Sequence, residues 1–98
     1  MNINMKVNRT ATYGTCFQGV VHTDYAELVR IFGPGTPQDG AKTNIEWRGT
    51  VDGEVFTIYD WKEGNVEYED IHEWHIGGNN EEVARKINDR VHSPILFE

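Results

Sequence analysis

The sequence predicts an α+β fold, a two-layer sandwich in which two helices cover one face of an antiparallel sheet of about four strands. Three observations lead to this class and to the element order β-α-β-β-β-α. Two segments, one after residue 24 and one after residue 80, have the apolar spacing of amphipathic helices. An Asp-Gly pair at 52–53 separates two strand-like runs, and further β-branched and aromatic runs supply the remaining strands.

Length and charge limit the classes of function. The chain has 98 residues and a formal charge of −7, which predicts one domain over 1–98. Within it we expect a polar leader or edge strand at 1–12, an α+β core at 13–92 and a tail at 93–98. The acidic balance argues against direct binding to nucleic acid or to an anionic membrane surface, which needs clustered Lys and Arg. We expect no membrane span and no signal peptide, and the single Cys16 excludes an internal disulfide framework.

The first strand is predicted over 15–22, a run of β-branched and aromatic residues. Alternation places Phe17 and Val21 on one side and Gln18 on the other. Asp24 and Glu27 then have the spacing of a capping box, which begins a helix. Its apolar stripe is Tyr25, Leu28, Val29 and Phe32. The helix ends at Gly33-Pro34, and residues 35–41 are predicted to form a loop.

The Asp52-Gly53 pair predicts a two-residue type I′ hairpin, because both central positions of that turn need a positive φ. In this register Trp47 faces Ile58 and Arg48 faces Thr57. The face expected to lie in the core carries Ile45, Trp47, Val51, Phe56 and Ile58. Tyr59 and Trp61 therefore stand on the opposite face, among polar groups.

A further strand is predicted over 71–76, with His72, Trp74 and Ile76 on one side and Glu73 and His75 on the other. Asn79 or Asn80 caps a last helix. The apolar positions of this helix are Val83, Ala84, Ile87 and Val91. It stops at Ser93-Pro94, and the apolar tail Ile95-Leu96-Phe97 packs on the core or makes a subunit contact.

Catalytic and metal chemistry find little support in the sequence. His72 and His75 are three apart on a strand, so they point to opposite faces and do not chelate one ion. Asp60 and Glu46 fall on opposite faces in the predicted register, which weakens an acid–base pair. We expect no enzyme activity, no cofactor and no metal. A small phosphodiester hydrolase that uses His75 with Glu73 or Asp60 remains an alternative.

The outward face of the hairpin has the chemistry of a binding site. Tyr59 and Trp61 form an aromatic platform with Arg48 beside it, and Lys42 and Lys62 lie at the nearest strand ends. Aromatic faces stack on flat bases, and Lys or Arg binds phosphate. The same residues suit a protein-binding hot spot. In another interpretation, a further strand, the leader or the tail covers these rings.

Glycines between the last strand and the last helix offer a second candidate. The segment Gly77-Gly78-Asn79 is predicted to place free backbone N–H groups at a helix start, where an anion is favoured. The same residues also suit a plain strand-to-helix turn.

Several strings of residues occur in an order that resembles a known group of proteins. They are Thr15-Cys16-Phe17-Gln18-Gly19, Tyr25-x-x-Leu28-Val29-x-x-Phe32-Gly33, Asp39-Gly40-x-Lys42, Glu46-Trp47, Thr57-Ile58-Tyr59-Asp60-Trp61-Lys62 and Glu73-Trp74-His75-Ile76-Gly77-Gly78. Over about residues 14–91 the chain resembles small accessory proteins encoded by tailed bacteriophages. Its Tyr-Asp-Trp-Lys and Trp-His-Ile-Gly-Gly strings are the most specific parts. The loop between these strings is short and acidic here, whereas in that group it is often longer and rich in glycine.

The resemblance implies a phage protein in the host bacterial cytoplasm that antagonises host defence. Our first hypothesis is a binding protein that sequesters a nucleotide-type immune signal without catalysis, in a pocket shared by a homo-oligomer. Its candidate ligand-binding residues are Gln18, Lys42, Arg48, Tyr59, Trp61, Lys62, His75, Gly77, Gly78 and Asn79. The alternative is an acidic inhibitor that blocks a host defence protein such as a CRISPR or restriction effector. It is suggested by the −7 charge and the acidic run from Glu63 to Asp70.

Overall fold

A six-stranded antiparallel sheet organises the part of the chain that the computed structural model describes, residues 1–7, 9–12, 14–39 and 42–93. Its strands are Ile3–Asn4 (β1), Cys16–His22 (β2), Thr36–Pro37 (β3), Ile45–Val51 (β4), Glu54–Tyr59 (β5) and Glu73–Gly78 (β6). They lie in the order β1-β4-β5-β6-β2, and β3 also pairs with β4. The helices are Tyr25–Phe32 (α1) and Glu81–His92 (α2), with 3₁₀ turns at Arg9–Thr12 (η1) and Tyr68–Asp70 (η2). This is the α+β class that the sequence predicts.

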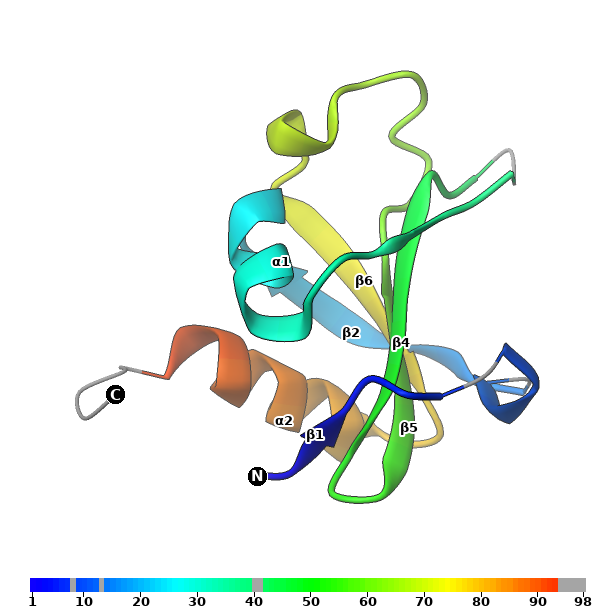
Figure 1. Cartoon of the computed structure of the whole chain (residues 1–98), viewed down its shortest axis with the longest axis vertical. Helices are drawn as coiled ribbons and strands as arrows, with labels where there is room; N and C mark the ends of the chain where they lie inside the picture. Colours follow the sequence, from blue (N-terminus) through cyan, green and yellow to red (C-terminus); the bar gives the residue numbers. More distant parts are fainter. Residues whose placement is uncertain (8, 13, 40–41, 94–98) are drawn as a thin grey trace.

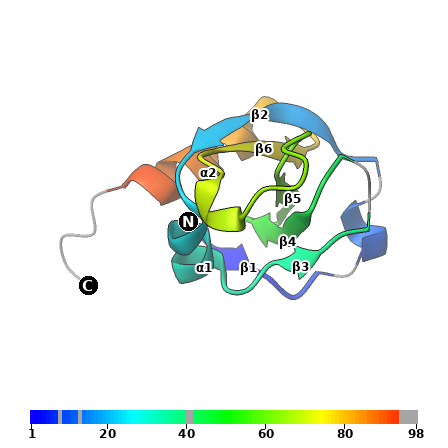
Figure 2. The ribbon, with the colours of Figure 1, turned by 90° about the horizontal axis from the view of Figure 1, so that it is seen from above.

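The sheet has two faces with different surroundings. Helices α1 and α2 lie on one side of it, and η1, the short dark-blue helix, lies on the other (Figure 1). Seen from above, the strands curve between the two helices and η1 (Figure 2). We call the side that carries η1 the open face.

The strand count differs from the predicted four because two short segments pair with β4. β1 pairs with its Thr50–Val51 end and β3 with its Ile45–Glu46 end. An unpaired edge exposes a row of backbone N–H and C=O groups, which these segments satisfy in part. The leader therefore does contribute an edge strand, and the predicted loop 35–41 contains β3. The apolar tail Ile95-Leu96-Phe97 lies outside the described residues.

The hairpin of β4 and β5 has the predicted turn and register. Asp52 and Gly53 have φ values of 51° and 84°, as a type I′ turn needs. Arg48 pairs with Thr57, and Trp47 with Ile58. The five residues predicted for the core face are all buried, and they are Ile45, Trp47, Val51, Phe56 and Ile58. The opposite face of the hairpin is therefore the open face.

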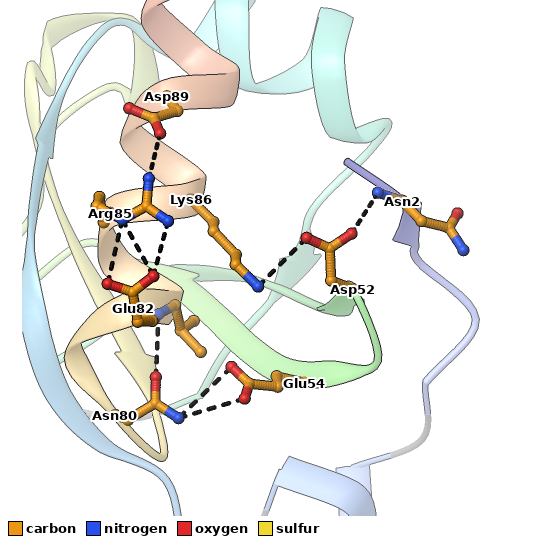
Figure 3. Close-up of polar contacts among 9 residues, drawn as sticks. Asn2, Asp52, Glu54, Asn80, Glu82, Arg85, Lys86 and Asp89 are labelled. Atoms are coloured by element: carbon orange, nitrogen blue, oxygen red, sulfur yellow. Dashed lines mark hydrogen bonds and ion pairs between the residues drawn. The ribbon is translucent and has the colours of Figure 1, made fainter.

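Polar contacts tie the hairpin turn to two distant segments (Figure 3). The backbone N–H of Asn2 donates to Asp52 Oδ1 at 2.8 Å, and Lys86 Nζ of α2 lies 3.3 Å from Asp52 Oδ2. The hydrogen bond from Asn2, followed by that from Lys86, lowers the pKa of the Asp52 carboxyl below its ordinary value. The Asp52 carboxylate thus joins the turn to α2 and to the residue that precedes β1.

Both helices begin at side-chain caps. Asp24 accepts a hydrogen bond from the N–H of Glu27 at 2.9 Å, as predicted, and Gly33 follows α1 with a φ of 84°. Of the two asparagines proposed for α2, Asn80 is the cap, and it accepts from the N–H of Val83 at 3.3 Å. The Asn80 amide also lies 3.4 Å from a carboxylate oxygen of Glu54 on β5 (Figure 3).

One side-chain assignment on β2 is wrong. The sequence pattern placed Phe17 and Val21 on the same side, but the pairing of β2 with β6 shifts between Phe17 and Gly19. The extra residue at this β-bulge reverses the alternation. Val21 is buried in the core, whereas Phe17 lies opposite Gly77 and is 54% exposed on the open face.

None of the helices in the described part of the chain has the length and apolar character that a bilayer crossing requires.

Candidate functional site

Four aromatic rings gather on the open face, and we call them the aromatic cluster: Phe17, Tyr59, Trp61 and His75. His75 is at the centre of this group. Its ring centroid lies 4.7 Å from that of Phe17, 5.6 Å from that of Tyr59 and 5.7 Å from that of Trp61. The planes of Trp61 and His75 are only 21° apart, so these two rings stack. Trp61 is 37% exposed, so solvent reaches part of this surface.

Two lysines flank the most exposed tryptophan. The Nζ atoms of Lys42 and Lys62 each lie 5.6 Å from the centroid of the Trp61 ring. This is the range of a cation–π interaction. The backbone brings the lysines together, because the N–H of Lys62 donates to the C=O of Lys42 at 2.8 Å. The cluster therefore has two positive charges over its Trp61 ring, on a chain that is acidic as a whole.

Asp60 positions the segment that carries Lys42. It is fully buried, and its Oδ1 accepts from the backbone N–H groups of Asn44 and Ile45 at 2.7 and 3.0 Å. Its Oδ2 accepts from the Asn44 amide at 2.8 Å. The carboxylate is thus engaged with the chain that precedes β4, away from the open face. This placement does not support Asp60 as an acid–base partner of His75.

The environment of the cluster changes the proton affinity of two of its members. Burial, then the nearby Glu46 carboxylate and Cys16, raise the pKa of Tyr59. Burial lowers the pKa of His75, although Glu73 and Glu63 act in the opposite direction. A lowered pKa keeps the His75 ring neutral at pH 7, which suits its stacking on Trp61.

The titration of His75 gives the first testable prediction. Its folded pKa lies below the ordinary 6.5, so between these values the unfolded chain binds more protons than the folded protein. The His75 contribution to stability is therefore present above pH 6.5 and lost as the pH falls through the folded pKa. NMR titration of the ring should give a pKa below 6.5 that rises in Trp61→Ala, where burial is reduced. An unshifted pKa in both proteins would contradict the packed cluster.

The structure brings together five of the ten residues predicted for the site. They are Lys42, Tyr59, Trp61, Lys62 and His75. Phe17 belongs with them but is missing from the prediction. The signal that could have found it is Gly19, since a glycine inside a strand often marks a bulge.

Three other predicted residues lie elsewhere. Gln18 is the residue at the bulge, and its amide donates to the C=O of Gly78 at 3.1 Å. Asn79 is exposed between β6 and α2. Arg48 forms an ion pair with Glu46, and both side chains are mostly buried on the open face.

The predicted glycine turn is wrong, because Gly77 and Gly78 are strand residues. Both are buried, and β6 pairs with β5 on one side and with β2 on the other. Their backbone groups therefore lie within a ladder instead of facing an anion. Glycine is required at position 77 for close packing of the strands, because a Cβ there would overlap with the hydroxyl oxygen of Thr57.

A polar pocket of about 270 Å³ lies beside the aromatic cluster on the open face. Its lining includes four threonines and the ion pair, namely Thr12, Thr15, Thr43, Thr57, Glu46 and Arg48. We call it the threonine pocket. It adjoins the cluster through β4 and β5, because Tyr59 pairs with Glu46 and Thr57 pairs with Arg48.

Among the described residues, no group of three His, Cys, Asp or Glu side chains is arranged to hold a metal ion. Glu73 lies 3.0 Å from His22 Nε2 across the β2–β6 pair. Cys16 is exposed.

Comparisons with protein-family models, with curated proteins and with solved structures find no match to this chain.

Proposed function

We propose that this chain is a non-catalytic binding protein that sequesters a nucleotide-type ligand on the aromatic cluster. The observation that carries the proposal is the stack of Trp61 on His75 with two lysines at the tryptophan. Base stacking on an aromatic side chain contributes about 1–3 kcal/mol, and it needs a ring face that the ligand can reach. The ammonium groups of Lys42 and Lys62, which lie over this ring, turn to the phosphates of the same ligand and leave a ring face to the base.

The cluster is better suited to binding than to catalysis. It consists of three apolar or weakly polar rings and a histidine with a lowered pKa, and two lysines lie next to it. Nucleotide hydrolysis needs a base that is oriented toward an attacking water by a partner group. Glu73, the carboxylate that the sequence suggested for this role, is hydrogen-bonded to His22. The proposed ligand is therefore held without being converted.

The proposal includes assembly into a homo-oligomer. Phe17 is 54% and Trp61 37% exposed, so a single copy covers only one side of a flat ligand. Ligand pockets usually bury 70–90% or more of a drug-sized ligand's surface, and a second copy of the chain would supply the other wall. From the resemblance to phage accessory proteins we further propose that the ligand is an immune signal of the bacterial host.

Removal of the Trp61 ring provides the direct test. Calorimetry of the full chain against cyclic and ADP-ribose-derived nucleotides should find at least one tight ligand, which is recovered unchanged after incubation. Trp61→Ala should weaken its binding by about 5- to 150-fold, the loss of one base-stacking interaction. Val66→Ala is the matched control, because Val66 is also apolar and is 42% exposed outside the cluster.

The outcomes separate the possible functions. Equal binding by wild type and Trp61→Ala would overturn the stacking site, and conversion of the ligand would favour the hydrolase alternative. If the folded protein gives no binding signal with any nucleotide of the panel, the nucleotide proposal is overturned.

The second candidate, an acidic inhibitor of a host defence protein, is favoured by one observation. Exposed Phe17 and Trp61 beside Tyr59 have the composition of an interface hot spot, where aromatic residues are enriched. A pull-down from host lysate distinguishes the two functions. A signal-binding protein retains no stoichiometric protein partner, whereas an inhibitor retains one that Trp61→Ala releases.

A further inference from the structure

The threonine pocket extends the aromatic cluster along the open face. Thr57 and Tyr59 are two residues apart on β5, so their side chains point to the same face about 7 Å apart. Their partners on β4 are Arg48 and Glu46. The pocket therefore adjoins Tyr59, the ring of the aromatic cluster that is nearest to Thr57 along β5.

The size of the pocket indicates that it holds part of a ligand. Its volume of about 270 Å³ is below the roughly 300–1,000 Å³ of typical complete ligand sites. A group bound there would extend out of the pocket, and the adjacent surface is the aromatic cluster.

The side chains that line the threonine pocket indicate which part of a ligand it binds. Threonine hydroxyls both donate and accept hydrogen bonds, a guanidinium donates, and a carboxylate accepts. This mixture matches the hydroxyls of a sugar, and acidic side chains hydrogen-bond ribose hydroxyls in dinucleotide-binding folds. A phosphate fits less well, because Glu46 is paired with Arg48 and its negative charge would repel a second anion.

We infer that the threonine pocket is a subsite for the sugar of the proposed ligand, with its hydroxyls directed at Thr43, Arg48 and Glu46. The inference rests on the proposed function and specifies its ligand as a ribonucleotide. The base lies on the aromatic cluster, the sugar enters the pocket, and the phosphates reach Lys42 and Lys62. Selection between ribose and deoxyribose then occurs in the pocket and not on the rings.

Fragments of the ligand test the pocket separately from the rings. Amide chemical shifts of the full chain are followed by NMR during titrations with D-ribose 5-phosphate, 2-deoxy-D-ribose 5-phosphate and adenine, each at millimolar concentration. Ribose 5-phosphate should shift the signals of Thr43, Arg48 and Thr57. The deoxy sugar should bind more weakly, and adenine should shift the signals of Trp61 and His75.

Thr43→Val removes one hydroxyl and keeps the branched shape. It should weaken ribose 5-phosphate binding by about 2- to 12-fold, the loss of one hydrogen bond, and leave adenine binding unchanged. Thr50→Val is the matched control. Thr50 is on the same face of β4 as Arg48, but it does not line the pocket. It should leave both titrations unchanged.

Failure of the inference differs from failure of the proposed function. The sugar subsite is overturned if ribose 5-phosphate shifts no pocket signal, or if the deoxy sugar or Thr43→Val binds equally well. The nucleotide proposal fails if adenine leaves Trp61 and His75 unaffected while ribose 5-phosphate binds, in which case the pocket stands as a sugar site alone.

Discussion

Trp47→Ala should lower the free energy of unfolding by about 3–5 kcal/mol, the typical cost of truncating a large core aromatic side chain. Trp47 is 1% exposed and packs edge-on against Trp74, with ring centroids 5.5 Å apart. Its indole N–H donates to the C=O of Gly33 at 2.8 Å. The truncation therefore leaves a cavity in the core and removes the partner of a carbonyl at the end of α1.

Urea denaturation of Trp47→Ala and Trp61→Ala, side by side, measures the effect. The control variant removes the same type of side chain from the segment that follows β5, where Trp61 lies on the open face and is 37% exposed. Its two aromatic contacts are worth about 0.5–1.5 kcal/mol each, so its loss should cost less than that of Trp47. Equal destabilisation by the two substitutions would contradict the assignment of the sheet faces.

Gly77→Ala should destabilise the fold by about 2–3 kcal/mol, within the usual cost of overpacking. The added methyl group would overlap with Thr57 Oγ1, and Thr57 is only 4% exposed on the adjacent strand. A threonine side chain is stiff at χ1, so it has little freedom to move aside. Gly77 also has Tyr59 Cε1 within 3.6 Å of the same position. The substitution should therefore disturb the cluster as well as the strand.

A double-mutant cycle isolates this contact. Thr57→Ala removes the overlapping oxygen, so Gly77→Ala should cost less than about 1 kcal/mol in that background. Gly19→Ala on β2 is the comparison with a less severe steric overlap, since the added Cβ would lie 3.2 Å from the Cβ of Ala84. An unchanged cost of Gly77→Ala in the two backgrounds would assign the effect to the backbone instead of to Thr57.

The predictions that succeeded depend on local chemistry. An Asp-Gly pair in a two-residue turn fixes the register of its flanking strands, so the burial of Trp47 and the outward position of Trp61 follow from sequence. Asp24 and Gly33 likewise determine where α1 begins and ends, because each satisfies backbone groups within one turn of the helix. Such features need no knowledge of distant residues.

The predictions that failed depend on contacts between distant segments. Phe17 faces outward because a bulge forms where β2 meets β6, residues that lie far apart in sequence. The sequence predicts Gly77 in a turn, but this glycine is required on β6 because Thr57 occupies the space that a side chain would fill. The segments β1 and β3 are two residues long, and they are strands only because β4 presents an edge.

The sequence by itself determined the α+β class, the hairpin, three rings of the aromatic cluster and the two lysines beside them, since each depends on periodicity or on a single turn. Only the tertiary structure decided that Phe17 joins the cluster, that Asp60 supports the segment of Lys42 and that threonines form a pocket beside Tyr59. A binding surface depends on which strands are neighbours and in what register. Those pairings are set by the packing of the whole sheet against its helices, and no local pattern contains them.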